Sequence, residues 1–170
     1  TQSSRRGTAV HQICEDYLNN KEYTLKHMPS NLELFRTIRP ILDKNVELVY
    51  HQEVPLYSDK LKAAGRVDCV CKWNGKDAIV DFKTSSKPKK KEWVEDYYLQ
   101  LTAYALAHNE LYDTNIRSGH IFMCSRDFQY QQFDLLEEDF AQWESKWWDR
   151  VYLYYDCLLY TSDAADDFTS

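Results

Sequence analysis

Residues 65–91 read GRVDCVCKWNGKDAIVDFKTSSKPKKK, and this stretch decides the fold. Its first half alternates like a β-strand with two different faces. One face is expected to carry Val67, Cys69, Cys71 and Trp73, and the other Arg66, Asp68, Val70 and Lys72. Asn74-Gly75 is a strong signal for a two-residue hairpin turn. The apolar run Ala78, Ile79, Val80 and Phe82 then predicts a second, buried strand, which completes a β-hairpin.

This hairpin is predicted to bring two carboxylates face to face. Asp68 lies six residues before Asn74 and Asp81 lies six after Gly75, so a two-residue turn pairs them across the strands. Like charges in such a pair are destabilising unless a cation lies between them. Oxygen ligands suit Mg²⁺ or Mn²⁺ better than zinc, so the pattern favours a site for one of these ions.

Lys83 lies two residues after Asp81 and therefore projects from the same face of its strand. An ammonium group there can position a metal-bound water or neutralise charge that develops on a phosphate. The alternative is a solvated ion network of Asp68, Asp81 and Lys83. That alternative does not explain why Asp81 lies in an apolar strand, so the metal site is the favoured interpretation.

Two residues outside the hairpin are weaker candidates for metal ligands. Glu53 lies on the preceding predicted strand, and a plain surface glutamate is an equally good interpretation. His11 lies on the first predicted helix with Glu15 one turn later, and a lone helical histidine is more often a packing residue.

The remaining sequence predicts helices on both sides of a sheet. Helical periodicity covers residues 5–20, and Ser30-Asn31 is the expected N-cap of a second helix that Pro40 kinks or ends early. Further strands are expected at 46–57, 64–73, 77–82, 116–124 and 128–133, and further helices at 92–111 and from about 136. This order predicts one α/β domain over residues 1–156, with helices flanking a mixed sheet.

Composition excludes several classes of protein. The 170 residues are 44% hydrophobic, which is enough for a buried core, and no run of 18 apolar residues predicts a membrane span. The net charge of −6 disfavours binding to nucleic acid by bulk charge. Any such binding is expected to be local, and the basic patch is the loop with Lys87, Lys89, Lys90 and Lys91, for which a solvated loop is the alternative. The five cysteines form no C-x-x-C pair and are expected to be reduced core thiols.

The two ends of the chain are interpreted separately. Residues 157–170 read CLLYTSDAADDFTS, which resembles the translation of a transposon-end adapter used in sequencing libraries. We therefore expect this tail to lie outside the fold, and an acidic natural tail is the alternative. The chain begins at Thr1 and not at Met, which is typical of an internal cut, so a targeting segment that has been lost is compatible with the sequence.

Four motifs in order resemble one enzyme family. GRVD contributes Asp68, IVDFKTS contributes Asp81 and Lys83, QLTAY contributes Gln100 and Tyr104, and RGTAVHQICE contributes Gly7 and His11. Together they resemble the PD-(D/E)xK nucleases, in the RecB-like branch that includes the mitochondrial genome-maintenance exonucleases and their phage relatives. The resemblance covers roughly residues 5–155 and implies a restriction-endonuclease-like α/β core.

The resemblance also implies roles for these residues. Asp68, Asp81, the Phe82 carbonyl and His11 would hold Mg²⁺ or Mn²⁺, Lys83 would orient the attacking water, and Gln100 and Tyr104 would contact the phosphate backbone or brace the catalytic strand. The lysine loop resembles a DNA-contacting stretch of the family. The cysteine pattern of iron–sulfur members is missing, so no iron–sulfur cluster is expected.

The function implied is a metal-dependent DNA exonuclease that prefers single-stranded ends or flaps and leaves a 5′-phosphate. It would act as a monomer in DNA repair or replication, in the cytoplasm of a bacterial or phage-infected cell. One alternative is a structure-specific or restriction-like endonuclease on the same core. Another is a noncatalytic nucleic-acid-binding module, although such modules usually lack a metal ligand or the lysine.

Overall fold

The computed structural model describes residues 2–60, 63–85, 90, 94–125, 127 and 129–169, and it describes side chains between residues 9 and 157 except at Ala63 and Ala64. Two helices precede three strands, and a third helix separates these strands from two further strands and the last helix. In order, the elements are α1 (Gln2–Leu18), α2 (Pro29–Asn45), β1 (Val46–Ser58), β2 (Ala63–Trp73), β3 (Lys76–Ser85), α3 (Glu95–Tyr112), β4 (Gly119–Ser125), β5 (Tyr130–Leu135), the short 3₁₀ helix η2 (Glu137–Asp139) and α4 (Phe140–Thr169).

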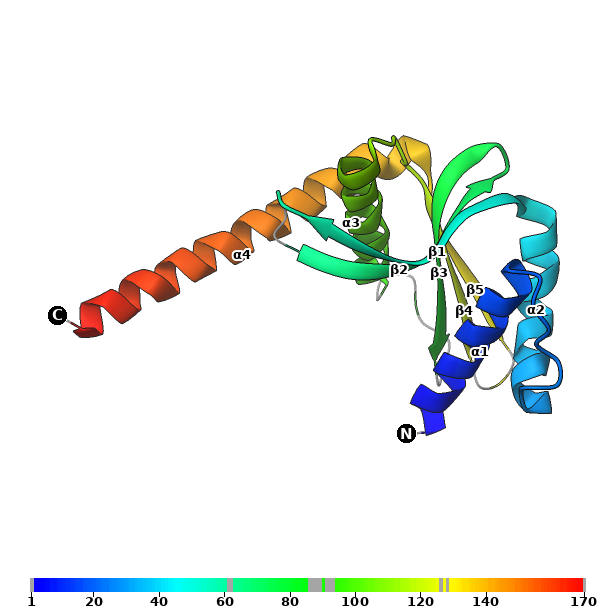
Figure 1. Cartoon of the computed structure of the whole chain (residues 1–170). Helices are drawn as coiled ribbons and strands as arrows, with labels where there is room; N and C mark the ends of the chain where they lie inside the picture. The colour runs from blue at the N-terminus through cyan, green and yellow to red at the C-terminus, as the bar shows by residue number, and fades with distance from the viewer. Residues whose placement is uncertain are drawn as a thin grey trace.

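The five strands form one mixed sheet in the order β1-β2-β3-β4-β5. Strands β3 and β4 are parallel because α3 crosses over between them, whereas the other neighbouring pairs are antiparallel. Figure 1 shows the sheet nearly edge-on, with α1 and α2 on one side and α3 and α4 on the other. The predicted α/β fold, with helices flanking a mixed sheet, is confirmed.

Each face of the sheet has its own hydrophobic core. The core under α1 and α2 includes Phe35, Ile38 and Phe122, together with the buried thiols of Cys14, Cys69, Cys71 and Cys124. The core under α3 includes Val70, Ile79, Leu101 and Ile121. Alternate residues of the central strands supply the two cores, since successive side chains of a strand point to opposite faces. The prediction of core thiols is confirmed for these four cysteines.

The expected N-cap and the expected early end of the second helix are both wrong. Its N-cap is Met28, not Ser30-Asn31, and Met28 makes no side-chain capping bond. Pro29 lies in the first turn. Proline is tolerated there because the first turn needs no backbone N–H. Pro40 does not end the helix, which continues to Asn45. Pro40 is itself exposed, and burial of Leu42 beyond it stabilises the last turn.

The hairpin has the predicted register up to its open end. Trp73 pairs with Lys76 next to the Asn74-Gly75 turn, and the pairing runs back to Cys69 and Val80. Beyond that pair β2 separates from β3, while β1 and β2 stay paired as far as Ser58 and Ala63. The two strands therefore leave the sheet as an arm (Figure 1). We call the opening between the arm and β3 the fork.

The separation of β2 corrects the predicted face of Val67. Cys69, Cys71 and Trp73 pack under α1 and α2 as expected, but Val67 packs in the core under α3 together with Val70. Residues 67 and 70 lie an odd number of positions apart, so strict alternation would place them on opposite faces. The alternation is therefore interrupted close to Asp68, where β2 leaves β3.

Helix α4 begins against α3, where the rings of Tyr98 and Trp143 stack with centroids 4.9 Å apart. It continues to Thr169 and projects away from the sheet in Figure 1. The backbone of residues 157–169 thus extends this helix, which their apolar spacing permits.

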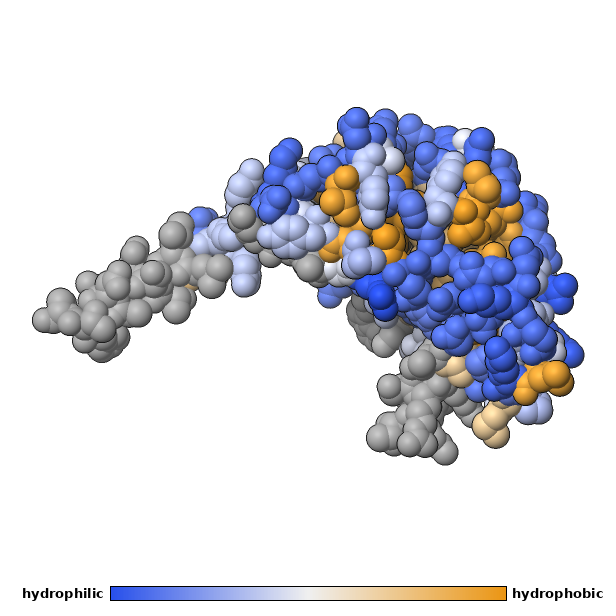
Figure 2. Space-filling model, in the orientation of Figure 1, coloured by the Kyte–Doolittle hydropathy of each residue, from blue (hydrophilic) through white to orange (hydrophobic). Residues whose placement is uncertain are grey.

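Among the described residues, no helix is long and apolar enough to cross a membrane. The coloured surface in Figure 2 is mostly hydrophilic on the face shown, with hydrophobic side chains in separate areas.

Candidate active site

The fork between β2 and β3 holds the two predicted carboxylates. Asp68 lies one position beyond the last ladder pair, and its Oδ2 accepts a hydrogen bond of 2.9 Å from the backbone N–H of Phe82. The N–H and C=O of one residue in an antiparallel ladder point to the same neighbouring strand. The Phe82 carbonyl is therefore also directed toward β2, into the fork. The predicted use of this carbonyl as a ligand is compatible with that direction.

Asp81 and Lys83 form a close ion pair on the α3 side of β3. Lys83 Nζ lies 2.8 Å from Asp81 Oδ2, and the two side chains are 21% and 8% exposed. The prediction that both project from one strand face is confirmed. Lys83 Nζ also lies 4.9 Å from the centre of the Tyr97 ring, within the range of a cation–π interaction. No sequence motif had indicated Tyr97 as a site residue.

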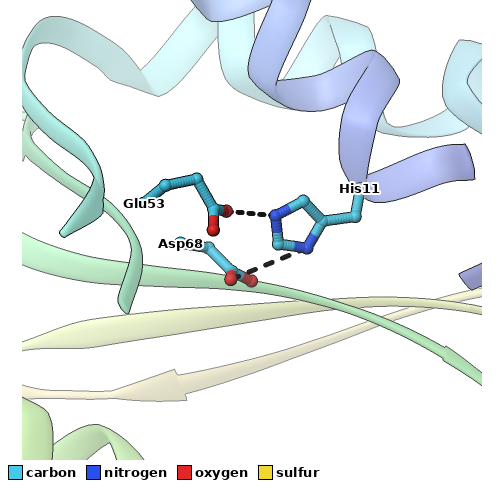
Figure 3. Close-up of side chains that lie close together, drawn as sticks. All are labelled: His11, Glu53 and Asp68. Carbon is cyan, nitrogen blue, oxygen red and sulfur yellow. Dashed lines mark hydrogen bonds and ion pairs between the residues drawn. The ribbon is translucent and has the colours of Figure 1, made fainter. Parts of the chain in front are cut away.

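His11 enters the fork from α1 and joins two carboxylates there (Figure 3). Its Nδ1 lies 3.6 Å from Asp68 Oδ1, and its Nε2 contacts Glu53 Oε1. One ligand atom from each of His11, Glu53 and Asp68 falls within 4.8 Å of the others. Three residues from three separate elements thus converge on one point, as expected of metal ligands.

Glu53 reaches this point through an unusual backbone conformation. It lies opposite Asp68 because its neighbours Gln52 and Val54 pair with Cys69 and Val67. Its φ is +52°, in the left-handed region that costs a non-glycine residue on the order of 1 kcal/mol. Strain of this kind is often found at functional sites, where other contacts hold it in place. No local sequence signal marks this conformation, which explains why Glu53 was only a weak candidate.

The carboxylates of the fork repel one another in the absence of a cation. Burial raises the pKa of Asp68 well above its ordinary value, and the hydrogen bond and charge of Asp81 raise it further. The N–H of Phe82 acts in the opposite direction. An ion such as Mg²⁺ or Mn²⁺ would relieve this repulsion, and the donor groups nearby are of the type that these ions bind. They are the carboxylates of Glu53, Asp68 and Asp81, the Phe82 carbonyl and the His11 imidazole.

Gln100 and Tyr104 lie one turn apart on α3, and Gln100 Nε2 donates to Tyr104 Oη at 3.0 Å. Burial raises the pKa of Tyr104, and the charge of Asp81 raises it further. The phenol therefore lies close to the carboxylates. A Cβ atom on Gly65 would lie 2.9 Å from Tyr104 Cε1, so the glycine lets the ring approach β2 closely. Both side chains line a groove of about 340 Å³ that also reaches Trp147 and Arg150 on α4.

The predicted DNA-contact loop falls largely outside the described residues. Lys87, Lys89 and Lys91 are not described, and Lys90 is exposed. Gly7 lies in α1, but its surroundings are likewise outside the described part. The roles proposed for these residues therefore stay predictions.

Comparison with known proteins agrees with the motifs. The sequence pattern of the PD-(D/E)XK nuclease superfamily matches residues 31–154, a range that contains Glu53, Asp68, Asp81 and Lys83. The chain belongs to this superfamily.

Two curated relatives are named as exonucleases. The chain is 30% identical over 151 residues to mitochondrial genome maintenance exonuclease 1 of Homo sapiens. The aligned region covers 84% of this chain and 43% of the human protein. It is 31% identical over 101 residues to the Mus musculus protein of the same name, covering 56% of this chain and 28% of that protein. The chain thus spans less than half the length of these relatives.

One solved structure has the same fold. A candidate exonuclease from Eubacterium rectale superposes with a TM-score of 0.57 and 12% identity, over 94% of this chain and 68% of that one. At this identity the likeness concerns the fold alone. It supports the arrangement of helices and strands described above.

Proposed function

We propose that this protein is a Mg²⁺- or Mn²⁺-dependent exonuclease that hydrolyses phosphodiester bonds at single-stranded DNA ends, in DNA repair or replication. The observation that carries the proposal is the convergence of His11, Glu53 and Asp68 on one point, with the Asp81–Lys83 ion pair next to Asp68. The similarity to mitochondrial genome maintenance exonuclease 1 supports an exonuclease over other reactions of the superfamily.

Asp68, Asp81, His11 and the Phe82 carbonyl would hold the ion, with Glu53 as a further ligand. When bound, the ion would activate water and offset negative charge on the phosphate. A cation at this point would also have a structural effect, because it would allow Asp68 to remain ionised beside Asp81.

Lys83 has the position and the environment for a role in hydrolysis. Its ammonium group is held by Asp81 on one side and by the Tyr97 ring on another, so few rotamers are open to it. A preorganised charge of this kind can hold the attacking water and stabilise charge on the phosphoryl oxygens. Gln100 can donate a hydrogen bond to a phosphate, while Tyr104 orients the Gln100 amide.

The experiment that tests the proposal compares linear and circular single-stranded DNA of one sequence, end-labelled where an end exists, with Mg²⁺ and with EDTA. An exonuclease releases nucleotides from the linear substrate only, and only with the metal. Cleavage of the circle would instead identify an endonuclease, and binding without any cleavage would identify a noncatalytic module.

The lysine loop gives a prediction about DNA affinity. Replacing Lys87, Lys89, Lys90 and Lys91 with Ala should weaken binding equally across sequences, because lysine contacts phosphates and not bases. The slope of log affinity against log salt should fall by about 0.7 for each lost contact to a single strand. Fluorescence anisotropy at several salt concentrations measures this slope. The matched control replaces four exposed lysines elsewhere, Lys21, Lys26, Lys44 and Lys146, and an equal loss of slope there would contradict a specific contact.

The C-terminal tail gives a prediction about rate. A chain ending at Asp156 should cleave DNA with the same metal requirement and the same rate, because every residue proposed for the active site lies between His11 and Tyr104. Steady-state cleavage and thermal unfolding of the two chains measure this. A folded but inactive truncated chain would show that the tail contributes to function.

A further inference from the structure

The groove of about 340 Å³ that contains Gln100 and Tyr104 connects the active site with helix α4. It lies between the arm of β1 and β2, helix α3 and helix α4, each of which contributes lining residues. In Figure 1 the arm and α4 extend from the sheet in the same direction, next to α3. Gln100 donates to Tyr104, and the Tyr104 phenol lies close to Asp81. The groove is therefore continuous with the fork.

The lining of this groove is mainly apolar and its charges cancel. Asp96 and Arg150 are the charged residues among the described lining, and Arg150 Nη1 lies 2.7 Å from Asp96 Oδ1. A phosphate gains little from a surface on which the cation is already paired. An uncharged aromatic ring, in contrast, can be buried on apolar side chains with a few polar groups at its edge. The apolar side chains include Leu56, Leu99, Ala103 and Ala107.

Trp147 gives the groove an aromatic wall that the fold itself does not use for stacking. The two neighbouring tryptophans of α4 are engaged elsewhere, since Trp143 stacks on Tyr98 at 4.9 Å and Trp148 packs against Tyr152 at 6.1 Å between ring centres. Trp147 lines the groove instead, and no aromatic ring of the described residues packs on it. A partly buried indole of this kind is a platform on which a nucleobase can stack.

We propose that this groove is the subsite for one base of single-stranded DNA, next to the phosphate that is cleaved at the fork. The inference rests on the proposed function and adds the part of the substrate that is recognised. The base stacks on Trp147, and the Asp96–Arg150 pair offers its edge both an acceptor and donors. Gln100 lies between this base and the fork, in position for the connecting phosphate.

Such a subsite selects single strands over duplexes. A base enters the groove only after it has left the stack, and in a duplex it must also break its base pair. An apolar side chain of a partner protein is another occupant of suitable size. The wall that the groove shares with the active site, through Gln100 and Tyr104, favours the substrate itself.

The test places one abasic residue at successive positions near the end of a linear single-stranded DNA. Fluorescence anisotropy in EDTA measures affinity, and cleavage with Mg²⁺ measures KM and kcat. Loss of the base should weaken affinity and raise KM about 5- to 150-fold at one position beside the scissile phosphate, and much less elsewhere. Equal affinity and equal KM for every abasic position would overturn the subsite.

Replacing Trp147 tests the stacking contact itself. Trp147→Ala should weaken binding of intact DNA by the same factor and remove the penalty at the abasic position, because both changes delete one contact. Trp147→Phe keeps a ring and should restore most of the affinity. Trp148→Ala, the matched control on the same helix, lies outside the groove lining and should keep the wild-type pattern. A full abasic penalty in Trp147→Ala would contradict the proposal.

A variant that fills the groove keeps the test valid if loss of Trp147 impairs folding. Ala103→Phe adds a ring within the groove and should weaken binding of intact DNA but not of DNA that is abasic at the sensitive position. Equal weakening of both DNAs would count against the subsite. A protein that cleaves linear DNA without any base-dependent position would reject the subsite alone. Base-dependent binding without cleavage would support the subsite and reject the nuclease function.

Discussion

Asp81→Asn and Lys83→Ala are each expected to lower the rate of DNA cleavage by about 10²-fold or more, with the fold retained. Both groups act on charge that develops in the transition state, and loss of one preorganised group commonly has an effect of this size. Asn keeps the shape of Asp81 at the fork but cannot pair with Lys83 as an ion. Single-turnover cleavage of end-labelled linear DNA at saturating Mg²⁺ measures the rate.

Two matched variants control for general damage to the protein. Asp149→Asn and Lys44→Ala make the same chemical changes at exposed positions of α4 and α2 and should cleave normally. Circular dichroism should show the same helix content in all four variants. If either Asp81→Asn or Lys83→Ala cleaves at a nearly normal rate, the proposed site is wrong.

Asp68→Asn is expected to stabilise the metal-free protein in a pH-dependent manner. Burial and Asp81 raise the pKa of Asp68 to about 9 in the folded state, against about 4 for an unfolded carboxyl. The folded state therefore holds this proton more tightly, and wild-type stability falls as pH rises from about 4 toward 9. Asn has no proton to lose, so the variant escapes this fall.

Thermal unfolding in EDTA at pH 4, 6 and 8 measures the effect. The melting temperatures of wild type and variant should be similar at pH 4 and should separate progressively above it, by about 2–4 °C for each kcal/mol recovered. Mg²⁺ should raise the melting temperature of the wild type and raise that of the variant less, because a ligand is lost. A pH-independent difference, or an undiminished Mg²⁺ effect, would contradict a metal shared by Asp68 and Asp81.

Local patterns were enough to predict the main elements of the site. The Asn74-Gly75 turn defines the register of β2 and β3, and strand periodicity places Asp81 and Lys83 on one face. Turn type and side-chain alternation depend on residues a few positions apart, so they can be read along the chain. The same holds for the helices and for the mixed sheet, whose parallel pair requires the crossover helix α3.

The rest of the site required the tertiary structure. Periodicity and turn signals could not place His11 and Glu53 beside Asp68, and only the family resemblance suggested His11. These residues come from separate elements that meet only when α1 packs on the sheet. The packing of Val67 under α3 and the left-handed conformation of Glu53 arise where β2 leaves β3, which no single segment encodes. Short-range periodicity determined the strands and their carboxylates, whereas long-range packing determined which side chains share a site.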